Sequence, residues 1–125
     1  MKISISYPPL PSEKGVPLLS QNRQFQWFSE PTYIYPMVPA YAASLLYQAG
    51  HEVIWDDGIA EEKTYEQWFK DIVREQSDII AIETKTPVVK RHWKIINQLK
   101  EELPDTKIVL MGDHVTALPL ESFQH

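Results

Sequence analysis

The sequence has no cysteine among its 125 residues. This absence excludes disulfide bonds, thiolate zinc sites and iron–sulfur clusters held by this chain alone. Long apolar runs are also absent, since no window approaches about eighteen consecutive apolar residues, and this excludes a transmembrane helix. The opening residues, MKISISYPPLP, lack the apolar segment of a secretory signal. We therefore expect a cytoplasmic protein that does not enter a membrane.

Positive charge is in short supply, with 12 Lys and Arg against 17 Asp and Glu and a net charge of −5. No block or stripe of basic residues is present, so the chain lacks the electrostatic footprint of a nucleic-acid-binding protein. The rest of the composition is ordinary for a globular protein, with 43% hydrophobic and 23% charged residues. The length suits one domain, residues 1–125, that is large enough to enclose a core.

Strand patterns alternate with helix patterns along the chain. Apolar runs predict strands at 2–7, 52–56, 78–83 and 107–111. Helical periodicity predicts helices at 39–49, 65–75 and 86–103, and the start of another at 117–123. Such alternation implies right-handed βαβ crossovers and an α/β open parallel sheet with helices on both faces. Because a fifth strand would be expected next, we expect the chain to be one module of a longer polypeptide.

Local signals mark the ends and faces of these helices. Thr64 and Gln67 form the pattern of a capping box before the second helix. Thr86 and Pro87 suit the N-cap and first turn of the third helix. In the first helix we expect the sheet to be faced by an apolar stripe made of Val38, Tyr41, Ala42, Leu45, Leu46 and Ala49.

The segment from Pro8 to Tyr35, about 28 residues, has no convincing periodicity, and loops of such length are usually functional or disordered. It is rich in proline and in aromatic residues, whereas disordered tails contain few aromatic residues. We therefore interpret it as an ordered lid or docking surface.

Ligands of open parallel sheets bind beyond the carboxyl ends of the strands, near the point where the strand order reverses. Pro8 and Pro9 follow the first predicted strand and are expected at that edge. The segments after the third and fourth strands supply the other candidates, which are Glu83, Thr84, Lys85, Thr86, Gly112, Asp113, His114, Val115 and Thr116. A helix beginning after the third strand would favour an anion or polar ligand with its free N–H groups. Gly112 permits close backbone approach or a positive φ.

Other polar residues favour structural interpretations. His51 precedes the second strand and belongs to the opposite edge, and His92 falls on the apolar stripe of its helix as a hydrogen-bonded core residue would. Asp56 and Asp57 could bind a divalent cation, but turn formation before Gly58 is the favoured interpretation. His114 with its neighbouring aspartate falls short of the ligand number that zinc requires. No Ser-His-Asp pattern, P-loop or dinucleotide fingerprint is present.

Four stretches together resemble the cobalamin-binding domain at the N-terminus of many radical S-adenosylmethionine enzymes. They are YPPL, YPMVPAYAASLLYQAGHEVIWDD, DIIAIETKTP and VLMGDHVTALPLESF. In that family an Asn-Pro-Pro-like turn ends the first strand, and an Ala-Gly-His-x-Val unit leads into the second. A Gly-Gly-x-His-x-Thr-like segment follows the fourth strand. The resemblance covers nearly the whole chain.

This resemblance implies a flavodoxin-like (Rossmann-like) sheet that holds cobalamin at its carboxyl edge, in contact with Pro8, Pro9, residues 83–86 and residues 112–116. It also implies methyl transfer from S-adenosylmethionine, with a 4Fe-4S cluster in a radical catalytic domain of the same polypeptide. The cluster's cysteines are absent here, so this part alone is not expected to be catalytic. The Asp-x-His-x-x-Gly motif is absent, so no histidine ligand to cobalt is expected. Met111 stands where the family has its first glycine.

Two other functions have the same predicted topology. A signalling receiver needs acids after the first strand and a phospho-acceptor Asp after the third, where this chain has Pro8-Pro9 and Glu83-Thr84. An interaction domain without cofactor would instead dock a partner through the aromatic segment 23–35.

Overall fold

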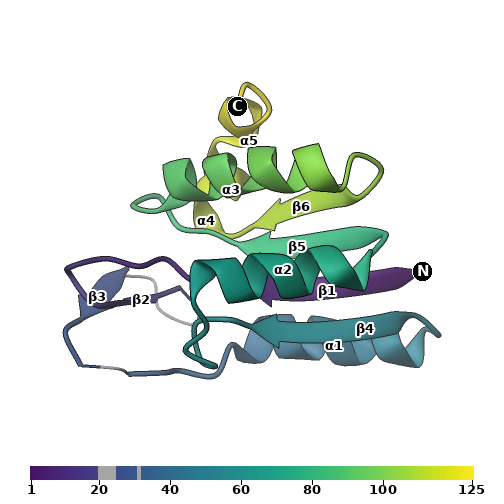
Figure 1. The fold of residues 1–125 in the computed structure, drawn as a ribbon, viewed down its shortest axis with the longest axis horizontal. Coiled ribbons are helices and arrows are strands. Elements are labelled where there is room, and N and C mark those ends of the chain that lie inside the picture. Colours follow the sequence, from purple (N-terminus) through teal and green to yellow (C-terminus); the bar gives the residue numbers. More distant parts are fainter. Residues whose placement is uncertain (20–24, 31) are drawn as a thin grey trace.

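A four-stranded sheet forms the centre of the computed structural model, which describes residues 1–19, 25–30 and 32–125. All strands are parallel and lie in the order β4-β1-β5-β6 (Figure 1). Their bounds are Lys2–Tyr7 for β1, Glu52–Asp57 for β4, Ile79–Glu83 for β5 and Lys107–Met111 for β6. The strand order reverses between β1 and β5. The predicted α/β flavodoxin-like open parallel sheet is confirmed.

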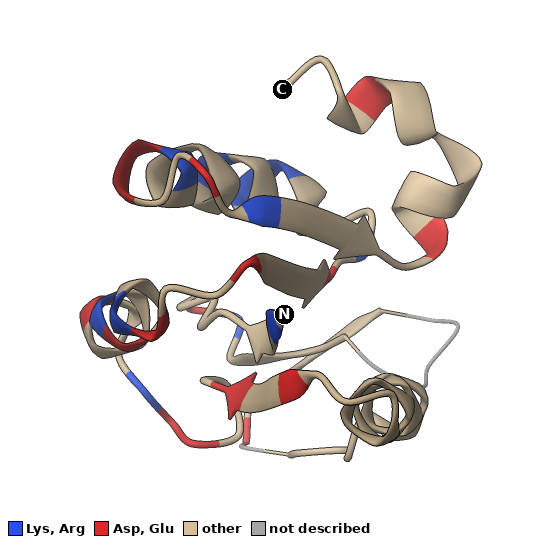
Figure 2. Ribbon diagram, turned by 90° about the vertical axis from the view of Figure 1, so that its right-hand side faces the viewer, with Lys and Arg blue, Asp and Glu red and all other residues tan. Residues whose placement is uncertain are grey.

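Helices lie on both faces of this sheet. α1 (Met37–Gln48) lies on one face, behind β4 in Figure 1, while α2 (Tyr65–Glu75) and α3 (Val89–Glu102) cover the other face. Two short helices, α4 (Asp113–Ala117) and α5 (Pro119–Ser122), follow β6 on the same side as α1 (Figure 2). The crossovers between successive parallel strands therefore use both faces, as a flavodoxin-like topology requires.

The predicted capping box is confirmed. The Thr64 hydroxyl accepts from the Gln67 amide at 3.2 Å, and the Gln67 side chain accepts from the Thr64 amide at 3.0 Å. The start predicted for the third helix, with Thr86 as N-cap and Pro87 as first helical residue, is too early by two residues. α3 begins at Val89, because the amides of Val88 and Val89 both bond to the Lys85 carbonyl at 3.0 Å and close a turn over residues 86–88. Thr86 is therefore no N-cap.

The predicted start of a helix at 117–123 is also incorrect in detail. α4 begins earlier, at Asp113, and ends at Ala117, after which Leu118 leaves the helical conformation. Pro119 then opens α5 as its first residue, where a missing N–H costs no hydrogen bond. A proline at this position fixes a boundary that the apolar pattern alone does not show.

The main core lies between the sheet and the helices α2 and α3. Ile80 and Ile82 of β5 are fully buried there, together with Trp68 of α2 and Leu99 of α3. Polar Ser6 is accommodated because its hydroxyl donates to Asp56 at 2.6 Å and accepts from the Trp68 indole at 2.8 Å. Each buried polar atom of this contact has a partner, which offsets the cost of removing it from water.

The stripe predicted for α1 does not face the sheet as a unit. Pro39 is buried, and Leu46 packs against the core, whereas Val38, Tyr41 and Leu45 are 74%, 67% and 65% exposed. The helix is apolar all round and carries no charged residue (Figure 2). The hydrophobic periodicity therefore could not identify the buried side, because the helix has apolar side chains on every side.

Part of the long segment after β1 forms an antiparallel hairpin of β2 (Val16–Leu18) and β3 (Gln26–Phe28). This hairpin lies beyond the carboxyl ends of the strands (Figure 1). The sequence did not reveal it, since each strand has only three residues. Residues 20–24 and 31 of the predicted lid or docking surface lie outside the described residues.

Candidate functional site

The segments after β5 and β6 meet at the carboxyl edge of the sheet. The Thr84 amide donates to the Met111 carbonyl at 2.9 Å and extends the pairing of the two strands. Lys85 pairs with Asp113, with Nζ and Oδ2 2.8 Å apart. The predicted site residues 84–86 and 112–116 thus form one cluster, because β5 and β6 are neighbours in the sheet.

Gly112 is the point of closest backbone approach in this cluster. Its φ is +124°, and a Cβ built on it would lie 2.3 Å from the Thr84 carbonyl oxygen. Only glycine fits such a conformation and such a contact. The predicted positive φ is therefore confirmed, and the close approach is to the neighbouring loop of this chain.

His114 connects three elements at this edge. Its Nδ1 lies 3.1 Å from the Thr86 hydroxyl, and its Nε2 lies 2.9 Å from Glu121 of α5. The ring also contacts Trp93 of α3 edge-on, with centroids 6.2 Å apart. His114 is only 7% exposed and holds α4 and α5 against the β5–α3 turn, which is a structural role.

His92 lies in the core, as its position on the helix predicted. The ring is fully buried and its Nδ1 lies 2.7 Å from the Thr84 hydroxyl, which is itself fully buried. Burial, together with the nearby charge of Arg91, lowers the pKa of His92 to about 4. Its Nε2 has no hydrogen-bond partner among the described residues. The imidazole is therefore neutral at physiological pH and helps to fix Thr84.

Pro8 and Pro9 follow β1 at the same edge of the sheet, next to the end of its neighbour β5. Both are buried, and Pro9 lies close to Gly58 and Trp68 on the α2 side of the sheet. The end of β1 is linked to β5 by Tyr7, whose hydroxyl donates to Glu83 Oε2 at 2.7 Å within the core. Sequence reasoning places Tyr7 at this edge but does not include it among the site residues, although a tyrosine that ends a strand at the switch point was a usable signal.

The acidic pair after β4 belongs to turns and ion pairs. Asp56 accepts from Lys63 at 3.1 Å, and Asp57 accepts from the Ala60 amide at 2.9 Å. The favoured turn interpretation is confirmed. Among the residues that the structure describes, no three His, Cys, Asp or Glu side chains are grouped so that they could hold a metal ion. His51 lies just before β4, at the opposite edge, as predicted.

A groove of about 650 Å³ runs beside β6, one of the two edge strands of the sheet. Three of the predicted site residues, Gly112, Val115 and Thr116, line this groove. Apolar side chains such as Ile96 and Phe123 form other parts of its wall. Val109 of β6, also in this wall, is 45% exposed. The groove can accept a flat apolar group with a few polar atoms at the carboxyl end of the strand.

No protein-family model, curated protein or solved structure matches this chain. Across the described ranges, no helix combines the length and apolar character needed to cross a bilayer.

Proposed function

We propose that this chain is the cobalamin-binding module of a radical S-adenosylmethionine methyltransferase. The observation that supports the proposal most directly is the groove beside β6. Gly112, Val115 and Thr116 line it at the carboxyl end of the sheet. These residues belong to the segment whose sequence resembles the family's fourth-strand loop. Bound cobalamin would supply a methyl carrier, while this chain would bind and orient it.

The residues present fit such a cofactor in part. The apolar groove suits the benzimidazole tail. Asp113, which directly follows Gly112 of the groove wall, pairs with Lys85, and this pair would offer polar contacts outside the groove. Thr84 and His114 are buried and shape the two loops from within. Pro8, Pro9 and Glu83 are buried as well, so in this proposal they support the edge and contact the cofactor less directly.

S-adenosylmethionine and the 4Fe-4S cluster belong, in this proposal, to a catalytic domain of the same polypeptide. This chain has no cysteine with which to hold the cluster. The cytoplasmic location and the absence of nucleic-acid and membrane partners remain predictions from the sequence.

A titration with hydroxocobalamin tests the proposal. We expect the corrin absorbance to change on addition of the protein, and the coloured cofactor to co-elute with it on gel filtration. Val115→Trp fills the groove and should weaken binding by about tenfold or more. Val38→Trp is the matched control, because Val38 is 74% exposed on α1 and lies outside the groove. No spectral change and no co-elution would refute cobalamin binding.

The second candidate is an interaction domain without cofactor. It is favoured by one observation, the exposure of Tyr33, Ile34 and Tyr35 before α1, at 41%, 44% and 64%. The same titration distinguishes the two, since a docking domain leaves the corrin spectrum unchanged.

A further inference from the structure

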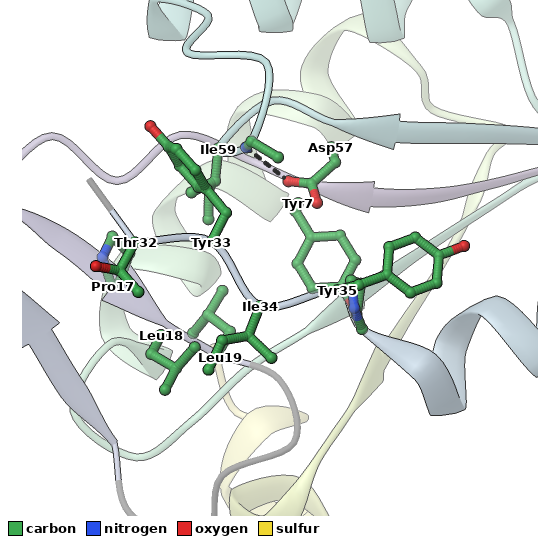
Figure 3. A pocket seen from close by; sticks show the side chains of 12 residues that line it. Tyr7, Pro17, Leu18, Leu19, Thr32, Tyr33, Ile34, Tyr35, Asp57 and Ile59 are labelled. Carbon is green, nitrogen blue, oxygen red and sulfur yellow. Dashed lines mark hydrogen bonds between the residues drawn. The ribbon is translucent and has the colours of Figure 1, made fainter.

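A second cavity, of about 210 Å³, opens at the carboxyl ends of β1 and β4. Tyr7 and Asp57 line this cavity, and in Figure 3 Tyr33 lies on one side of them and the Tyr35 ring on the other. None of the residues proposed to contact cobalamin lines it. The cavity therefore needs an explanation that is independent of the proposed function.

The aromatic walls of this cavity are held in place by contacts outside it. Trp55 of β4 contacts both the Tyr7 ring and the Tyr35 ring, with centroid distances of 6.0 and 5.9 Å. The Tyr33 hydroxyl donates to Glu62 at 2.7 Å. Aromatic rings present negative potential at their faces, so the three tyrosines that line the cavity favour a positively charged guest.

The charged group of the cavity is negative, as are the faces of the aromatic rings. Asp57 is the only charged residue among the described residues that line it. Burial raises the pKa of Asp57, the hydrogen bond from the Ala60 amide opposes the shift, and the charges of Asp56 and Glu61 add to it. The nearby Lys63 is engaged by Asp56, Glu61 and Asp71. A cation beside Asp57 would offset this accumulation of negative charge.

We propose that this cavity binds a small methylated ammonium group, with the carboxylate of Asp57 as counter-ion and the tyrosine rings as walls. Methyl groups on nitrogen match the aromatic surface, while the positive charge matches the carboxylate and the ring faces. An anion would meet Asp57 unfavourably. A neutral apolar guest would remove the same carboxylate from water without compensation.

Binding is tested with choline and with dimethylbutanol, the neutral analogue in which carbon replaces the nitrogen. Each is titrated into the whole chain while the indole resonance of Trp55 is followed by NMR. We expect a saturable shift with choline, and binding of the neutral analogue weaker by about tenfold. Equal binding of the two compounds, or no shift with choline, would overturn the proposal. A peptide that carries trimethyllysine presents the same group on a side chain. Tighter binding of the peptide would indicate a methylated protein as the ligand, and tighter binding of choline would indicate a small molecule.

Asp57→Asn removes the charge while keeping an oxygen that can accept from the Ala60 amide. We expect choline binding to weaken about tenfold, and Asp105→Asn, in the exposed loop before β6, serves as the matched control. If Asp57→Asn does not fold, the carboxyl resonance of Asp57 in the unaltered protein replaces it. Choline should then lower the Asp57 pKa, and an unchanged pKa at saturating choline would contradict the proposed counter-ion. Hydroxocobalamin binding is measured separately, so either proposal can fail alone.

Discussion

Thr84 joins three parts of the molecule through its backbone and its side chain. Its amide bonds to Met111 of β6, its hydroxyl contacts His92 of α3, and its carbonyl faces Gly112. All of these groups lie at the carboxyl edge where the groove beside β6 ends. The shape of this edge therefore depends on a few buried residues.

The buried imidazole of His92 predicts a pH dependence of stability. The ring has an ordinary pKa of 6.5, which burial and Arg91 lower to about 4, so the folded state favours the neutral form. Its contribution to the free energy of unfolding is complete above pH 6.5 and is lost as the pH falls toward about 4. The loss is about 3 kcal/mol. Urea unfolding measured across this range should show the decline.

The control for this prediction is the slope of stability against pH in His92→Gln. Whatever the variant costs at neutral pH, it should lose part of the decline between pH 6.5 and about 4. A decline as steep as that of the unaltered protein would assign the effect to other groups.

The conformation of Gly112 predicts that replacing it destabilises the protein, and replacement of Gly50 provides the comparison. Gly112→Ala must adopt a φ of +124° and meets the Thr84 carbonyl oxygen at 2.3 Å, so we expect a loss of about 3 kcal/mol. Gly50→Ala has a φ of +87° with nothing within 4 Å, and should cost about 1 kcal/mol. Chemical denaturation of both variants measures the difference, and equal losses would contradict the contact.

At the scale of the element, the helices differ in how well their sequences specify them. α2 has a polar face, a capping box and a regular apolar stripe, and its bounds were predicted at both ends. α1 carries no charged residue that would mark a polar face, so the hydrophobic pattern of the sequence did not identify its buried side. α3 began later than predicted because a turn over residues 86–88 used the carbonyl of Lys85.

A pair of leucines tests the assignment of helix faces. Leu99 of α3 is fully buried and Leu45 of α1 is 65% exposed. We expect Leu99→Ala to lower the free energy of unfolding by about 3 kcal/mol, because it leaves a cavity in the core. Leu45→Ala should change it by less than about 1 kcal/mol. Thermal or urea unfolding compares them directly, and a large loss at Leu45 would mean that α1 presents another face to the sheet.

At the scale of the whole molecule, the sheet is unequal at its two edges. Both β4 and β6 have a strand on one side only, but α1 packs against β4, whereas β6 borders the open groove. Central strands are hydrogen-bonded on both sides, so their amides open only with larger unfolding events.

The positions of the strands in the sheet predict an order of amide hydrogen exchange. Amides of β1 and β5, which lie at the centre of the sheet, should exchange most slowly. The amides of β6 that do not pair with β5, and those of the short β2–β3 hairpin, should exchange faster. Hydrogen exchange followed by NMR measures this order. Uniformly slow exchange across β6 would show that its outer edge is paired in solution.

The sequence by itself determined the alternation of strands and helices, and with it the parallel α/β sheet. It also placed residues 83–86 and 112–116 at one edge, because the ends of parallel strands lie together. Only the tertiary structure decided that Pro8 and Pro9 are buried, that Tyr7 reaches Glu83, and that His114 bonds to Glu121. The physical reason is range: periodicity and capping act over neighbouring residues, whereas these contacts depend on how distant segments pack.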